Sequence, residues 1–201
     1  MQTYQSDLNY ILNFQRFKVD NNDFEKYLTK DPGTFKSFID EFKVTRTFRK
    51  DETSNLLSLT LKWINRKDCN NVDGFAKHLR DHKITDGKIP ISLASKILFL
   101  NNPWVIIPFD SRTKKALGLR YNSYSHYQEL ALQYKKKNQA IIDNSLTFLK
   151  TYFGELENDY KSKLFKIEII RENRFVDKLL WTIGEKQKHP LTSPHPASRG
   201  S

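Results

Sequence analysis

The chain has 201 residues, of which 13% are aromatic and 38% hydrophobic, a composition that suits one folded domain or two small packed lobes. Its formal net charge of +11 favours a polyanionic partner, nucleic acid first, although an AT-rich genome would also enrich lysine. The single cysteine, Cys69, excludes an internal disulfide and a four-cysteine iron–sulfur cluster. No apolar run approaches the length of a membrane span, and no leader is recognisable, so we expect a cytoplasmic, monomeric protein.

Apolar residues recur at helical spacing through most of the chain, which predicts an all-α fold of two packed helical lobes. We expect helices near residues 8–14, 24–28, 35–42, 51–63, 71–83, 92–100, 111–117, 141–153, 160–170 and 171–183, and an aromatic, polar loop at 121–127 that leads into a helix ending at 137. The segment 44–49 is interpreted as a basic connector, and 84–88 as a hairpin between two helices. The expected single domain covers 1–185, with an N-terminal lobe (about 1–70), a central hairpin lobe (71–137) and C-terminal helices (138–185). Residues 186–201 are expected to be a disordered tail or a cloning remnant.

The stretch from Ile91 to Leu119 is the most informative part of the chain. A helix with a buried face ends at Asn101-Asn102-Pro103, an apolar run follows, and Asp110 then stands at the start of the next helix. The plain interpretation of Asp110 is a helix cap. The alternative is a carboxylate held at the floor of a cleft, with the basic residues Arg112, Lys114 and Lys115 beside it.

This stretch resembles the helix-hairpin-helix DNA glycosylase superfamily. In that family a hairpin helix begins with Lys-x-Ala or Ser-x-Ala, and an acid followed by Thr, Ser or Gly begins another helix about eighteen residues later. Here Ser92-x-Ala94 precedes Asp110 by 18 residues, and Ser111 follows the acid. The family's hairpin carries Gly-x-Gly before the helix, whereas this chain has Lys88-Ile89-Pro90. The resemblance therefore implies a remodelled helix-hairpin-helix-like central element.

The resemblance also implies roles for individual residues. Asp110 matches the catalytic acid, and Ser92 stands where strand-cleaving relatives carry a lysine nucleophile. A serine cannot form a Schiff base, so we expect a monofunctional enzyme. Lys96, one helical turn beyond Ser92 on the same face, is a second catalytic candidate as an amine; the alternative is that it pairs with an acid or a phosphate.

The expected partner is double-stranded DNA, and no cofactor or metal is expected, because the histidines lack the spacing of a metal site. The candidate DNA-binding residues are Lys83, Lys88, Ser92, Ser95, Arg112, Lys114 and Lys115. Candidates for an extruded-base pocket are Trp104, Phe109 and Tyr121. The lysines could instead form a solvated face, and the aromatic residues could belong to the core.

The sequence thus predicts a DNA glycosylase that leaves an abasic site, in base-excision repair or in defence against modified foreign DNA. One alternative is a non-catalytic DNA-binding module on the same scaffold, and another is a helical interaction protein. In the last helix, Arg174 and Asp177 are spaced for an i,i+3 ion pair, for which we expect a structural role.

Overall fold

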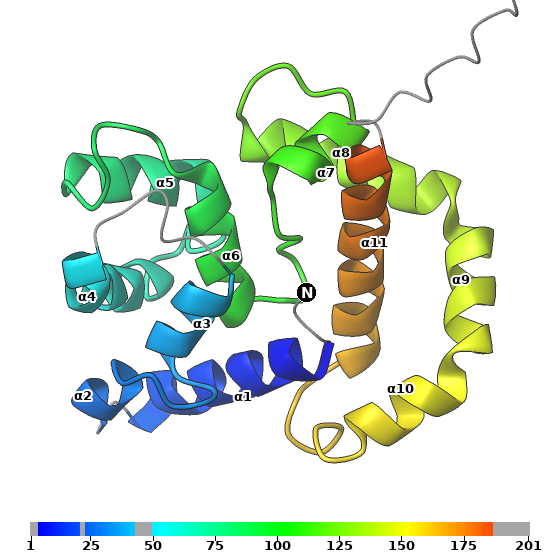
Figure 1. The fold of residues 1–201 in the computed structure, drawn as a ribbon, viewed down its shortest axis with the longest axis horizontal. Helices are drawn as coiled ribbons and strands as arrows, with labels where there is room; N and C mark the ends of the chain where they lie inside the picture. The colour runs from blue at the N-terminus through cyan, green and yellow to red at the C-terminus, as the bar shows by residue number, and fades with distance from the viewer. Residues whose placement is uncertain (1–3, 21–22, 43–49, 187–201) are drawn as a thin grey trace, which may run out of the picture.

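The computed structural model describes residues 4–20, 23–42 and 50–186. Over these residues the chain forms eleven α-helices and one short 3-10 helix, and no strand (Figure 1). The prediction of an all-α fold is confirmed. The segment 44–49 and the tail from residue 187 lie outside the described residues. None of the described helices is both long and apolar enough to cross a membrane.

Four α-helices form the N-terminal part of the described chain: α1 (Tyr4–Asp20), α2 (Phe24–Tyr27), α3 (Phe35–Glu41) and α4 (Thr53–Ile64). Their apolar residues repeat at helical spacing and are buried together, and Phe14, Phe38 and Leu57 are completely inaccessible to solvent. The side-chain amide of Gln15 on α1 donates to the carbonyl oxygens of Leu100 and Asn101, both at 2.8 Å. These bonds attach α1 to the end of α6.

The central part contains α5 (Val72–Asp81), α6 (Ile91–Asn101), α7 (Ser111–Ala116) and α8 (Tyr124–Lys137). Eight of the eleven residues of α6 are buried, so this helix is the core against which the others pack. A helix that is apolar nearly all round is stable only when it is enclosed on most sides. The half-buried exceptions on α6 are Ser92, Lys96 and Asn101, and the first two are the residues singled out by the sequence.

The chain ends with α9 (Gln139–Phe148), α10 (Lys150–Glu157) and α11 (Ile167–Lys186). In Figure 1, α9 and α10 curve around the outside while α11 returns to lie beside α7. The closest approach is at Gly184, where an added Cβ would lie 2.0 Å from the carbonyl oxygen of Arg112. Only a glycine lets the two backbones come this near, so Gly184 determines how closely α7 is held.

Two of the expected helices are wrong in extent. The helix expected over 141–153 is divided at Leu149 into α9 and α10. Only the end of the helix expected over 160–170 is helical, because residues 158–166 form turns and bends and α11 begins at Ile167. Tyr160 and Leu164 are buried, as their spacing predicts, but Lys166 adopts a left-handed conformation with φ of 47°. A residue in that conformation ends a right-handed helix.

Candidate functional site

The link between α5 and α6 forms a tight hairpin in which two residues have positive φ, Lys83 at 58° and Gly87 at 72°. The hydroxyl of Thr85 donates to the carbonyl oxygen of Lys88 at 2.6 Å and closes the turn. Pro90 stands before α6 and supplies no side-chain cap. The first amide groups of α6 are therefore left without the side-chain acceptor that a helix start usually has.

Asp110 is the N-cap of α7. Its Oδ1 accepts hydrogen bonds from the backbone amides of Arg112 at 2.8 Å and Thr113 at 2.9 Å. The Thr113 hydroxyl in turn accepts from the Asp110 amide at 3.0 Å, which completes a capping box. The plain interpretation as a cap is thus confirmed. No described residue donates a hydrogen bond to Oδ2, and the side chain is half-buried, so one carboxylate oxygen remains available for chemistry.

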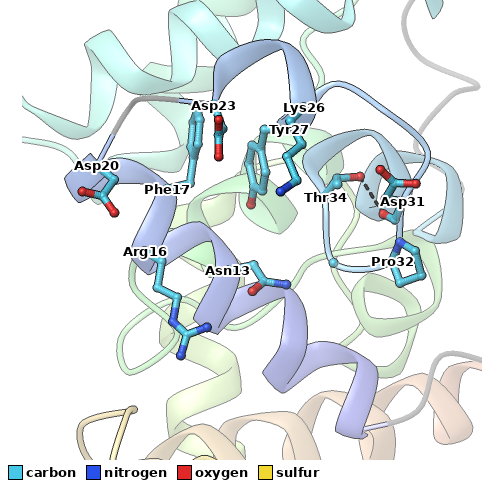
Figure 2. Close-up of a pocket in the computed structure, with 11 residues that line it drawn as sticks. Asn13, Arg16, Phe17, Asp20, Asp23, Lys26, Tyr27, Asp31, Pro32 and Thr34 are labelled. Atoms are coloured by element: carbon cyan, nitrogen blue, oxygen red, sulfur yellow. Dashed lines mark hydrogen bonds between the residues drawn. The ribbon is translucent and has the colours of Figure 1, made fainter.

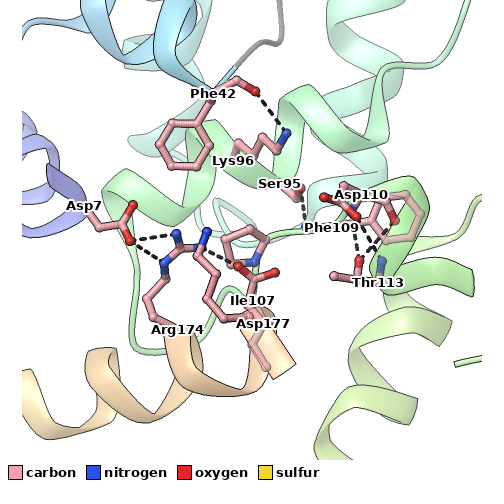
Figure 3. A network of polar contacts seen from close by, with 12 residues as sticks. Asp7, Phe42, Ser95, Lys96, Ile107, Phe109, Asp110, Thr113, Arg174 and Asp177 are labelled. Atoms are coloured by element: carbon pink, nitrogen blue, oxygen red, sulfur yellow. Dashed lines mark hydrogen bonds and ion pairs between the residues drawn. The ribbon is translucent and has the colours of Figure 1, made fainter. Parts of the chain in front are cut away.

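Lys96 projects from α6 toward Phe42 at the end of α3 (Figure 3). Its ammonium donates to the main-chain carbonyl of Phe42 at 3.4 Å and lies 5.8 Å from the centre of that ring. Burial lowers the pKa of Lys96, and the negative charges of Asp110 and Asp177 oppose that shift. The charge of Asp110 therefore acts on Lys96, although the two side chains form no direct ion pair in the described chain.

A buried ionic cluster lies beside these two residues. The Arg174 guanidinium on α11 pairs with Asp7 on α1 at 2.7 Å and with Asp177 on its own helix, and Figure 3 shows it between the two carboxylates. The predicted Arg174–Asp177 pair is confirmed. One guanidinium is shared by two buried carboxylates. For Asp177 the effect of burial, which raises the pKa, is larger than the opposing attraction of Arg174, and the pKa of Asp177 is raised to about 6. The cluster joins α1 to α11, across 167 residues of chain.

A hollow of about 680 Å³ opens between the hairpin, the start of α6 and α7. It brings together four of the predicted site residues: Lys88, Ser92, Phe109 and Lys114. Its other lining residues are Asp73, Lys77, Ile89, Pro90, Ile91, Ser111 and Asn122. Asp110 is not among them, although both of its sequence neighbours are. The hollow thus combines three lysines and one aspartate with apolar and neutral polar residues, and it adjoins the candidate catalytic acid without including it.

The cations predicted on α7 are engaged by neighbouring residues. The Arg112 guanidinium lies 3.9 Å from the centre of the Trp181 ring and 3.0 Å from a carboxylate oxygen of Glu185, both on α11. The Lys114 ammonium donates to the side-chain oxygen of Asn122 at 2.8 Å. Arg112 thereby contributes to the packing of α7 on α11, a role that its position in the sequence did not indicate.

The hairpin presents its cations differently. Lys83 and Lys88 are exposed, and their side chains form no hydrogen bond or ion pair with any described residue. Lys77 on α5, which also lines the hollow, is likewise exposed and unpaired within the described chain. Lys115 is exposed on α7.

Ser95 is a correction, because its side chain is completely buried and cannot reach DNA. Its hydroxyl donates to the carbonyl oxygen of Ser92 and accepts from the amide of Phe109, each at 3.0 Å. Ser95 therefore ties α6 to the segment that delivers Asp110. Phe109 is 4% exposed and packs edge-on against Tyr127 at 5.0 Å, so its ring belongs mainly to the core.

The other two aromatic candidates contact different parts of the chain. The Trp104 indole donates to the carbonyl oxygen of Phe165, in the turns before α11, whereas Arg112 contacts the far end of that helix. Tyr121 is 64% exposed and stacks on His126, with ring centres 6.1 Å apart. Of these three aromatic residues, only Phe109 lines the hollow beside Asp110.

Sequence reasoning missed several residues of this region. The carboxylate of Asp73 on α5 accepts hydrogen bonds from the backbone amides of Tyr124 at 2.8 Å and Ser125 at 2.9 Å, and so caps α8 from a distant helix. Lys178 on α11 is half-buried, and its pKa is lowered by burial and by the charge of Arg174. Both roles depend on contacts between distant segments, and no local sequence pattern predicts them.

A second hollow, of about 510 Å³, lies in the N-terminal part (Figure 2). The rings of Phe17 and Tyr27 are stacked there, 4.2 Å apart, and the charged residues Arg16, Asp23 and Lys26 surround them. The Tyr27 hydroxyl is buried and has no hydrogen-bond partner among the described residues. None of the predicted site residues lines this hollow.

No cluster of three or more His, Cys, Asp or Glu suited to a metal ion occurs within the described segments. Comparison with known proteins yields no match, whether to family models, to curated proteins or to solved structures.

Proposed function

We propose that this protein is a monofunctional DNA glycosylase. It would hydrolyse the N-glycosidic bond of a damaged or modified base in duplex DNA and leave an abasic site, in base-excision repair or in defence against modified foreign DNA. The observation that carries the proposal is the position of Asp110, whose Oδ1 caps α7 while Oδ2 accepts no hydrogen bond from the described residues.

The proposed reaction requires a carboxylate with an oxygen that is not already engaged by the protein. As the base departs, positive charge develops on the sugar, and a nearby carboxylate stabilises it or activates the attacking water. The capping box holds Asp110 through two amides and the Thr113 hydroxyl, so its orientation is set before a substrate arrives. Such preorganisation is what makes a fixed charge effective in a transition state.

The hollow beside Asp110 supplies the DNA-binding surface in this proposal. Lys77 and Lys88 are exposed at its rim, and the uncapped start of α6 faces the same space. Unpaired ammonium groups and helix N-termini are both common phosphate contacts. The net charge of +11 supports the same partner through longer-range attraction.

Ser92 at the start of α6 supports hydrolysis over strand cleavage at this position. Its hydroxyl cannot form the imine through which an amine nucleophile goes on to break the strand. The product in this proposal is therefore an abasic site in an intact strand, and borohydride should trap no covalent adduct at Ser92.

The runner-up is a non-catalytic DNA-binding module on the same scaffold. Two observations favour it: Asp110 already has a structural task as a cap, and it does not line the hollow. The hairpin also carries Lys88-Ile89-Pro90 where glycines would let a phosphate come close to the backbone.

One experiment separates the two candidates. Duplexes that each carry one damaged or phage-type modified base are incubated with the protein and then treated with hot alkali, which breaks the strand at abasic sites. The glycosylase predicts strand breaks that appear only after alkali, on at least one substrate. DNA binding without any alkali-labile product on a broad panel would support the non-catalytic module.

A further inference from the structure

Lys96 is an unusual lysine for a purely structural position. It is half-buried on the central helix α6, and its hydrogen-bond acceptor is a neutral main-chain carbonyl, that of Phe42. A buried ammonium is costly unless a carboxylate pairs with it. The neighbouring Arg174 shows how this protein satisfies a structural cation, because it contacts both Asp7 and Asp177 directly.

Four helical segments bring the relevant groups into one region. Phe42 ends α3, Lys96 belongs to α6, Asp110 begins α7 and Asp177 lies on α11 (Figure 3). Asp110 and Asp177 are the acids that act most strongly on Lys96, while Arg174 and Lys178 repel it. Burial is the largest influence and lowers the pKa of Lys96, so this ammonium releases its proton more readily than a solvent-exposed lysine does.

Glycosidic cleavage needs help at both ends of the breaking bond. The sugar becomes positive, and the electron pair of the bond passes to the base. The carboxylate of Asp110 can stabilise the positive sugar, but a carboxylate cannot stabilise a departing base that is gaining negative charge. An ammonium group on which the charge of Asp110 acts, without a direct ion pair between the two, has the charge and the proton that the base requires.

We infer that Lys96 is the general acid that protonates the departing base, and that the enzyme acts on bases that are neutral in DNA. This inference rests on the proposed glycosylase function. In the reaction the C1′–N bond breaks, its electron pair passes to the base, and Lys96 transfers one N–H proton to the base. Water adds to C1′ and gives up a proton toward Asp110, and solvent returns a proton to Lys96.

The neutral-base specificity follows from charge balance. A neutral base such as uracil, hypoxanthine or 8-oxoguanine leaves as an anion unless it receives a proton. A base already cationic through alkylation, such as 7-methylguanine, leaves as a neutral molecule and gains little from an acid. Removing Lys96 should therefore slow the excision of neutral bases and spare the excision of cationic ones.

The test compares Lys96→Met with the wild type on duplexes containing uracil, hypoxanthine, 8-oxoguanine or 7-methylguanine. General acid catalysis contributes about 100- to 10,000-fold, so we expect a loss of about 100-fold or more on the neutral bases. We expect any excision of 7-methylguanine to change only a few-fold. The decline of the wild-type rate at alkaline pH, where Lys96 loses its proton, should disappear in the variant.

Two controls keep the result interpretable. Lys136→Met removes an exposed lysine of α8 and should leave every rate unchanged. Lys96→Arg retains the positive charge but holds its proton too tightly to donate it, so it should remain slow on neutral bases. Urea unfolding of each variant shows whether the fold is retained.

The possible failures are distinct from one another. A wild type that excises none of the bases overturns the proposed function and this inference together. If folded Lys96→Met excises a neutral base as fast as the wild type does, the inference alone is overturned. It is also overturned alone if the wild type excises only 7-methylguanine. A borohydride-trapped adduct that is lost in Lys96→Met would instead make Lys96 a nucleophile.

Discussion

The positive charges of this protein fall into two regions with different environments. Arg112 on α7 contacts Glu185 and the Trp181 ring of α11, and Arg174 on α11 pairs with Asp7 of α1 and with Asp177. The hairpin lysines, which we define as Lys77, Lys83 and Lys88, are exposed and unpaired within the described chain. The sequence alone does not separate the regions, because Arg112 and Lys88 both flank the same motif.

The difference shows that the neighbouring elements decide what a cation does, because a lysine is anchored too where α11 offers a carboxylate, as Lys135 on α8 is by Glu172. α11 contributes Asp177 to Arg174, and it contributes Trp181 and Glu185 to Arg112, so both arginines have partners inside the protein. The hairpin lysines are exposed, and no described acidic residue pairs with them. Anchored cations therefore stabilise the fold, whereas the hairpin lysines remain available for phosphates.

Arg174→Met should cause the largest loss of stability. It leaves Asp7 and Asp177 buried without their partner, and breaking a buried ion pair costs about 3–5 kcal/mol. Lys88→Met, on the hairpin, should change the free energy of unfolding by about 0.5 kcal/mol or less. Urea unfolding of the two variants gives the comparison. Equal effects would contradict the division into anchored and free cations.

Gly184→Ala should be the next largest effect. The new Cβ would lie 2.0 Å from the carbonyl oxygen of Arg112 and would push α7 away from α11. Overpacking of this kind costs about 1–3 kcal/mol. The matched control is Gly154→Ala on α10, where an added Cβ meets no atom within 4 Å. The control should stabilise the protein by about 0.4–1 kcal/mol, as urea unfolding would show. A neutral Gly184→Ala would mean that α7 is not closely held.

The salt dependence of DNA binding should show the smallest effect. Replacing Lys88 by Gln removes one free ammonium, so the slope of log affinity against log salt should fall by about 0.9 for duplex DNA. Arg112→Gln should lower that slope less, because its guanidinium is already paired with Glu185. Fluorescence anisotropy over a series of KCl concentrations measures both. A larger change for Arg112→Gln would place the DNA contact on α7.

Much of the fold could be predicted from the sequence where local patterns decide the structure. Apolar spacing located α4, α5 and α6, and the position of Asp110 before an expected helix predicted its N-cap. The i,i+3 spacing of Arg174 and Asp177 predicted their ion pair correctly. These features depend on residues within one or two helical turns of one another.

The rest depends on contacts that no local pattern contains. Asp7 reaches Arg174 across 167 residues, and Trp104 donates to a carbonyl 61 residues away. Lys166 ends a periodic segment by adopting a positive φ, which a lysine does not signal. Ser95 was wrongly expected at the DNA surface because its hydroxyl suggests exposure, whereas two hydrogen bonds allow it to be buried.

The most direct test of the central claim is the excision rate of Asp110→Asn. Asparagine caps a helix as well as aspartate does, so the free energy of unfolding should be nearly unchanged, whereas Asp110→Ala should lose about 1 kcal/mol. Removing the charge should cost about 3–4 kcal/mol of transition-state stabilisation, or roughly two to three orders of magnitude in rate. On a substrate that the wild type excises, single-turnover kinetics should show this loss. A folded Asp110→Asn protein that excises the base at the wild-type rate would mean that Asp110 is only a cap.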